Sequence, residues 1–142
     1  MAGAVAVAVA TALSVSQPQL HGNELLDVIA ARTPAGAVRD KIVQAQSLRD
    51  SATAAAELGV GHDTSALDTV PFCLWVAARY RYDFAEACWT AAAAGGDIDT
   101  TCAIIGGVLG AQSTTSGIPS DWLSRCEPLP DWTAAYTTQT AP

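Results

Sequence analysis

Basic side chains are scarce in this chain of 142 residues, which contains 7 Lys and Arg against 14 Asp and Glu and has a net charge of −7. A surface with so few cations offers no electrostatic footprint for nucleic acid, and anionic membranes would repel it. We therefore expect neither nucleic acid nor a membrane as a partner. Some of the Asp and Glu side chains in such an acidic chain can also be ligands of a divalent cation.

Cysteine and histidine motifs are also missing. None of the four cysteines is in C-x-x-C spacing and no His lies at ligand spacing from them, which argues against a zinc site. We find no Ser-His-Asp or Cys-His nucleophile pattern and no Gly-rich phosphate loop. Cys73, Cys88 and Cys102 lie in apolar helical stretches, so we interpret them as reduced, structural thiols, which is typical of a cytoplasmic protein.

The N-terminal run over residues 2–15 consists mostly of Ala and Val, and no Lys or Arg precedes it. The charged first region of a signal peptide is therefore absent, although the core of such a signal remains the alternative interpretation. The run is too short and too rich in alanine to predict a membrane span. We interpret it as a helix of small residues that is buried on more than one side.

Strand patterns are lacking, because no segment has a convincing period of two, whereas apolar residues recur at helical spacing along the chain. The expected fold is all-α with about seven helices. A short helix is predicted over 24–32. The clearest amphipathic helix is predicted from Thr33, as its N-cap, through 34–58, with Gly59 after its end. Another helix is predicted over 66–82.

Helix signals are strongest in the second half of the chain. Asp83 and Glu86 have the spacing of a capping box, which predicts a helix over 84–94. A further helix is expected over 100–111, and its glycines would form a bare strip for close packing of another helix. A short helix is predicted over 119–125.

The turn between these helices carries the candidate chemistry. Gly95 and Gly96 allow the backbone to turn sharply and to lie close to another segment. Asp97, Asp99 and Thr100 then place hard oxygen ligands on one short turn, which suits Mg²⁺, Mn²⁺ or Ca²⁺. Asp and Thr are also ordinary N-cap residues, and the spacing alone favours a simple helix cap over a metal site.

Three segments, at 68–75, 95–107 and 117–123, resemble in sequence and in order the C-terminal half of the ADP-ribosylglycohydrolases, a family similar to dinitrogenase-reductase-activating glycohydrolase. The Gly-Asp-x-Asp-Thr-Thr element that begins at Gly96 is the most specific signature of that half. The resemblance extends over residues 2–132.

The resemblance implies an orthogonal multi-helix bundle that holds a dinuclear Mg²⁺ or Mn²⁺ centre. It implies hydrolysis of the bond between the distal ribose of ADP-ribose and an acceptor side chain or small molecule. Asp97, Asp99 and Thr100 match the C-terminal metal ligands of the family, and Gly95 and Gly96 would lie near the substrate. This resemblance shifts the interpretation from a simple cap to metal ligation.

The chain also departs from the family pattern. The family's N-terminal half holds a Thr-Asp-Asp element that supplies the other metal ligands, and no such element occurs here. We therefore expect the catalytic residues in a missing N-terminal half. The chain is interpreted as truncated at its N-terminus, with 1–132 as a partial helical domain and 133–142 as a flexible tail.

Three functions stay open on the sequence. The chain could be a component of an ADP-ribosylglycohydrolase that acts on an ADP-ribosylated substrate only together with a separate N-terminal half, and that is inactive alone. It could be a non-catalytic helical fragment or interaction module. It could also be a metal-dependent hydrolase of the same fold with another ribosylated substrate.

Overall fold

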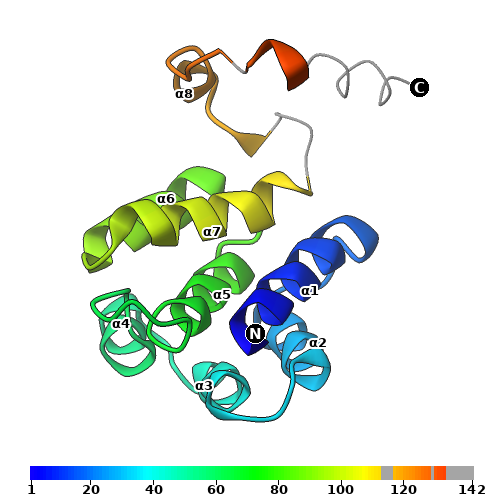
Figure 1. Cartoon of the computed structure of the whole chain (residues 1–142), viewed down its shortest axis with the longest axis vertical. Coiled ribbons are helices and arrows are strands. Elements are labelled where there is room, and N and C mark those ends of the chain that lie inside the picture. Colours follow the sequence, from blue (N-terminus) through cyan, green and yellow to red (C-terminus); the bar gives the residue numbers. More distant parts are fainter. Residues whose placement is uncertain (113–116, 129, 134–142) are drawn as a thin grey trace.

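The computed structural model describes residues 1–112, 117–128 and 130–133, and within these residues every regular element is a helix (Figure 1). This confirms the expected all-α fold, although the predicted tail lies outside the described residues from residue 134 onward. The elements in chain order are α1 (Ala2–Ser16), α2 (Gly22–Arg32), α3 (Ala37–Ala45), α4 (Ser51–Leu58), α5 (Val70–Arg79), α6 (Phe84–Ala94), α7 (Ile98–Gly110), α8 (Ser120–Leu123) and the 3₁₀ helix η2 (Asp131–Thr133).

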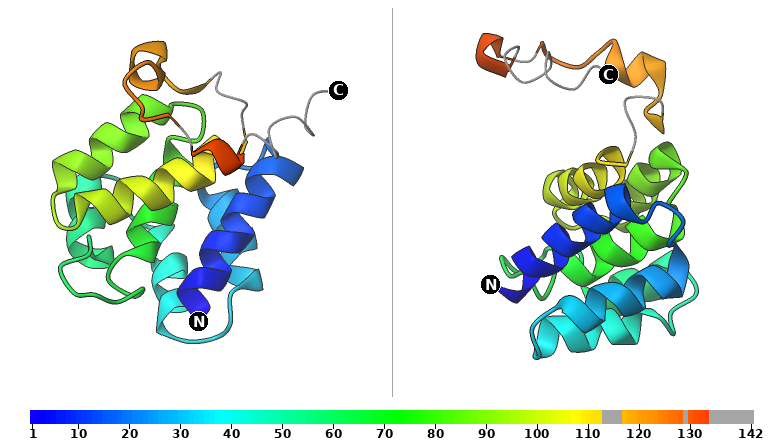
Figure 2. Two further views of the ribbon diagram at one scale, coloured as in Figure 1. Left: turned by 45° about the horizontal axis from the view of Figure 1, so that its top comes forward. Right: turned by 90° about the vertical axis from the view of Figure 1, so that its right-hand side faces the viewer.

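The helix α5 lies at the centre of the bundle, where it contacts each of α1 to α4, α6 and α7 (Figures 1 and 2). Its residues from Val70 to Ala78 are all buried. Phe72 stacks on Trp75 with ring centroids 6.3 Å apart. A helix that is apolar all round is stable only when other elements cover every side of it, so α5 organises the arrangement of its neighbours.

The predicted helix over 34–58 is wrong in one respect, because the structure divides it into α3 and α4. The side chain of Asp50 accepts a hydrogen bond from the Thr53 N–H at 2.8 Å and thereby starts α4 as its N-cap. The carbonyl groups in the break have partners on α5. Trp75 Nε1 donates to the Leu48 carbonyl at 3.3 Å, and Arg79 Nη2 donates to the Arg49 carbonyl at 2.7 Å.

Several predicted helix ends also differ from the structure. Thr33 does not start the next helix, because its hydroxyl donates to the Ile29 carbonyl at 2.8 Å and closes α2. The residue before α3 is instead Gly36, with φ of +137°. The helix α5 is shorter than the predicted 66–82, because Asp68 is engaged in a loop described below and Asp83 already caps α6.

The prediction that α1 is buried on more than one side is wrong. Its buried residues, namely Gly3, Ala6, Ala10, Leu13 and Ser14, form one face. The opposite face is exposed and entirely apolar over most of the helix, with Ala4, Val5, Ala8, Ala12 and Val15. No helix in the described part of the chain is long and apolar enough to cross a membrane.

The signals in the second half of the chain predicted the structure well. Asp83 Oδ1 accepts from the Glu86 N–H at 2.9 Å, and α6 has the predicted bounds. The short helix α8 lies beyond the α6–α7 pair (Figure 2), where Trp122 meets Phe84 and Trp89 edge to face at centroid distances of 6.2 and 5.9 Å.

The glycines of α7 only partly match the predicted packing strip. A side chain at Gly106 would reach ordinary contact with Phe84, whereas Gly107 and Gly110 have no neighbour among the described residues within 4 Å of the position of a Cβ atom. Within the described part of the chain, Gly106 is thus the only one of the three that lies against another helix.

The four cysteines are free thiols. Burial raises the pKa of Cys73 to about 12 and that of Cys88 to about 11. These two thiols therefore stay protonated near neutral pH, as expected of structural cysteines.

Arg81 is a buried charge with few partners. Its side chain is 3% exposed, and burial lowers the pKa of its guanidinium group. Nη1 donates to Ser14 Oγ at 2.6 Å, whereas Nε and Nη2 are buried without a hydrogen-bond partner among the described residues. A buried cation without a carboxylate partner destabilises the folded state, and the Ser14 hydroxyl is its main compensation.

We predict that Ser14→Ala lowers the free energy of unfolding by about 1–3 kcal/mol, because it removes the acceptor of a buried charged donor. Arg81→Met fills a similar volume without a charge and is expected to be neutral or stabilising. Urea unfolding of both single variants and of the double variant tests this. In the Arg81→Met background, Ser14→Ala should cost much less, and additive effects would contradict the proposed coupling.

Candidate metal-binding turn

The turn between α6 and α7 is made by two glycines and an N-cap aspartate. Gly95 and Gly96 have φ of +77° and +69°, a conformation that glycine adopts far more readily than other residues. Asp97 follows as the N-cap of α7, and its Oδ1 accepts a hydrogen bond from the Thr100 N–H at 3.2 Å. The capping interpretation of Asp97 is therefore confirmed, and capping occupies one of its two carboxylate oxygens.

The turn packs against a loop over residues 59–68, between α4 and α5. The Asp97 N–H donates to the Val60 carbonyl at 2.9 Å. A Cβ atom on Gly96 would overlap the same carbonyl oxygen, and a Cβ atom on Gly61 would lie 2.7 Å from the Asp97 Cβ. The expected close approach of backbone therefore occurs at Gly96, whereas a Cβ atom on Gly95 would meet none of the described residues within 4 Å.

Asp68 in turn holds the loop. Its backbone carbonyl accepts from the Gly61 N–H at 2.8 Å, and its Oδ2 accepts from the Asp63 N–H at 2.8 Å. The sequence predicted Asp68 in the first turn of the helix over 66–82, which is wrong because α5 begins at Val70. It also assigned no role at the site to Val60, Gly61 or Asp68. The available signal was Gly59-Val-Gly61, because two glycines separated by one residue indicate a loop that approaches other backbone closely.

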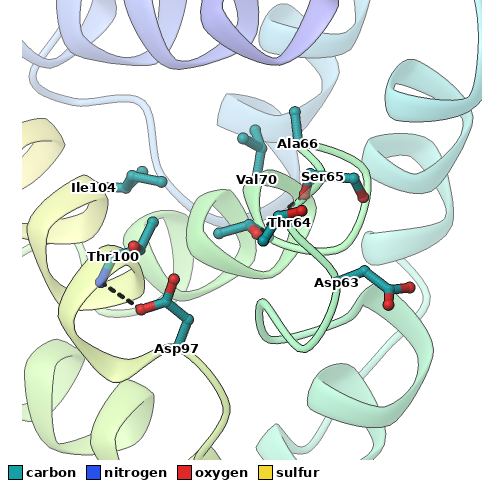
Figure 3. Close-up of a pocket in the computed structure, with 9 residues that line it drawn as sticks. Asp63, Thr64, Ser65, Ala66, Val70, Asp97, Thr100 and Ile104 are labelled. Carbon is teal, nitrogen blue, oxygen red and sulfur yellow. Dashed lines mark hydrogen bonds between the residues drawn. The ribbon is translucent and has the colours of Figure 1, made fainter.

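The turn borders a cavity of about 290 Å³ (Figure 3). Asp97 and Thr100 contribute polar groups to it from α7, and Thr69 does so from the segment before α5. The Asp63 side chain points away from Asp97 in this view. The full lining comprises residues 63–66, Thr69, Val70, Asp97, Thr100 and Ile104.

The local electrostatics favour a charged carboxylate at Asp97. Thr100 holds the pKa of Asp97 below its ordinary value through its hydroxyl and through its backbone N–H, and of these the N–H makes the hydrogen bond described above. The positive end of the α7 dipole also favours negative charge at this position. Asp97 is therefore ionised at neutral pH and available as an anionic oxygen donor.

Asp99 lies in the first turn of α7 and is exposed. It is close enough to Cys102, one helical turn later, for its charge to raise the pKa of that thiol, in addition to the larger effect of burial. Cys102 faces α6, where its thiol donates to the Cys88 carbonyl at 3.7 Å. The structure thus brings Asp97 and Thr100 together at the cavity and places Asp99 on the neighbouring flank of the helix.

The donor chemistry of the turn suits a hard cation such as Mg²⁺ or Mn²⁺, because all three side chains offer oxygen. Two carboxylates and one hydroxyl are fewer than the six oxygen ligands that such a cation takes. Among the described residues, no group of three or more His, Cys, Asp or Glu side chains is placed to hold a metal ion.

Comparison with known proteins identifies the family. A family model described as ADP-ribosylglycohydrolase matches residues 1–141. The chain belongs to the ADP-ribosylglycohydrolase family. A relative from Archaeoglobus fulgidus, named only as an uncharacterized protein, is 36% identical over 127 residues, which cover 85% of this chain and 39% of the relative. The chain thus spans about two fifths of the length of that relative. No solved structure matches the chain.

We predict that the two glycines of the turn tolerate substitution differently. Gly95→Ala introduces only an unfavourable backbone conformation, which costs about 1–3 kcal/mol. Gly96→Ala adds an overlap with the Val60 carbonyl and should cost at least about 2 kcal/mol more, as overpacked sites do. Urea unfolding measures both losses. Equal losses would contradict the close packing of the turn against the loop.

Proposed function

We propose that this chain carries part of the cation site of an ADP-ribosylglycohydrolase that hydrolyses the bond between ADP-ribose and an acceptor side chain or small molecule. The observation that carries the proposal is the family match over 1–141 together with an exposed Asp97-Ile98-Asp99-Thr100 turn beside a cavity. The substrate class follows from the family, and the turn is the part of the chain that suits its chemistry.

The proposed donors to Mg²⁺ or Mn²⁺ are the carboxylates of Asp97 and Asp99 and the hydroxyl of Thr100. A bound cation would supply stabilisation of negative charge during hydrolysis. The residues of this chain would orient the oxygen donors. The cap on the Thr100 N–H fixes one Asp97 oxygen and leaves the other free, while Gly96 holds the turn against the Val60 carbonyl.

The remaining donors would come from polypeptide outside residues 1–142, in the same chain or in a separate N-terminal half. The outer face of α1 supports this part of the proposal. Five apolar residues are exposed there, and an apolar helix face of this kind is typical of an interface. The unmatched part of the Archaeoglobus relative is polypeptide that this face could receive.

Calorimetric titration of Mn²⁺ tests the donors separately from the cap. Asp97→Asn keeps an N-cap oxygen, because Asn and Asp cap helices about equally well, but it removes the negative charge. We predict at least about tenfold weaker Mn²⁺ binding for Asp97→Asn and for Asp99→Ala, because a cation of this class prefers anionic oxygens.

Asp83→Asn is the matched control, since Asp83 caps α6 through the same contact with the third residue after it. This control should leave the Mn²⁺ affinity unchanged, and all three variants should keep the helical circular dichroism of the parent chain. Equal Mn²⁺ affinities in the parent, Asp97→Asn and Asp99→Ala would disprove the assigned ligands.

Release of ADP-ribose in the presence of Mg²⁺ tests the activity. We predict little or no turnover by the 142-residue chain alone, because its described donors are too few for a complete site. Turnover should appear when the unmatched part of the Archaeoglobus relative is added, and it should be lost in Asp97→Asn. Robust turnover by the chain alone would contradict the partial site, and no turnover in the mixture would favour a non-catalytic interaction module.

A further inference from the structure

We infer that Asp68 is a positioning residue that holds the Asp97 turn in place through the loop segment 59–63. The inference rests on the proposed function only for what the turn binds. The contacts that lead from Asp68 to the turn form a short chain of three steps.

The first step is from Asp68 to its own loop. Asp68 Oδ2 accepts the Asp63 N–H and the Asp68 carbonyl accepts the Gly61 N–H, both at 2.8 Å. A Cβ atom on Gly59 would overlap Asp68 Oδ1, so the carboxylate also lies directly against the start of the loop. Asp68 therefore contacts the segment 59–63 at its beginning, its middle and its end.

The second step is from the loop to the turn. Between the two glycines of the loop, the Val60 side chain is buried and its carbonyl accepts the Asp97 N–H at 2.9 Å. The absence of a Cβ atom on Gly61 leaves the space that the Asp97 Cβ occupies. A shift of this loop would therefore displace the backbone and the Cβ of Asp97 together.

The third step is the separation of Asp68 from the site. Asp68 lines a second cavity, of about 240 Å³, together with His62 and Ala94, whereas Asp97 lines the first cavity. The two carboxylates thus belong to different cavities on either side of the loop. Asp68 is therefore placed to act on Asp97 through the backbone of the loop.

Amide hydrogen exchange measured by NMR tests the inference. In Asp68→Ala the Asp63 amide loses its acceptor directly, so its faster exchange is expected under any model. The informative amide is that of Asp97, which should exchange at least about fivefold faster because the loop no longer holds the Val60 carbonyl in place. The amide of Ile42 in α3 should not change.

Two further variants sharpen the result. Asp68→Asn keeps a side-chain oxygen for the Asp63 N–H and should restore slow exchange at Asp97. Asp63→Ala removes a carboxylate from the same loop but keeps the backbone donor, and it should leave the Asp97 amide unchanged. An unchanged Asp97 amide in Asp68→Ala, or an equal increase at Asp97 and Ile42, would overturn the inference, since the latter indicates global destabilisation.

Mn²⁺ titration of the same variants separates this inference from the proposed function. If the turn binds Mn²⁺, Asp68→Ala should weaken binding several-fold and Asp68→Asn should largely restore it. A parent chain that does not bind Mn²⁺ would contradict the proposed function, while selective exchange at Asp97 would still support the role of Asp68. Unchanged Mn²⁺ affinity in Asp68→Ala, with a parent that binds, would overturn the positioning role.

Discussion

The burial of α5 from Val70 to Ala78 is the constraint on which the other helices depend. Along this stretch α5 has apolar side chains on every side, so six neighbouring helices surround it. Trp75 and Arg79 also reach past the core to the carbonyl groups in the break between α3 and α4. The same helix thus supplies apolar packing and satisfies the backbone where a neighbouring helix is interrupted.

The candidate site depends on backbone packing more than on side-chain contacts. Asp97 starts α7 by capping it, and its own N–H is held by the Val60 carbonyl in a loop that Asp68 organises. A helix N-terminus, a glycine turn and a neighbouring loop together determine where one carboxylate lies. The exposed oxygens of the turn are therefore presented by a supported backbone, which is the condition for a ligand that must not move when it binds a cation.

Features that are decided by residues close together in the sequence could be predicted, whereas features that are decided by contacts between distant residues could not. The bounds of α6 could be predicted because Asp83 and Gly95 are local signals at its two ends. The break before Asp50 could not be predicted, because the helical spacing of apolar residues continues through it. The hydrogen bond that satisfies the Leu48 carbonyl in the break comes from Trp75, which is far away in the sequence. The motif indicated the turn at Asp97 as a candidate site, whereas the contact of this turn with Val60 is a tertiary feature that no local spacing reveals.

The bond between the Asp97 N–H and the Val60 carbonyl has a consequence for the order of folding. Its two residues are separated in sequence by all of α5 and α6, so closing this contact carries the loop entropy of a long intervening segment. The helices can form and dock through nearer contacts before this bond is made. A partly folded chain can therefore have the Asp97 cap, which is local to α7, before the turn is placed against the Val60 carbonyl.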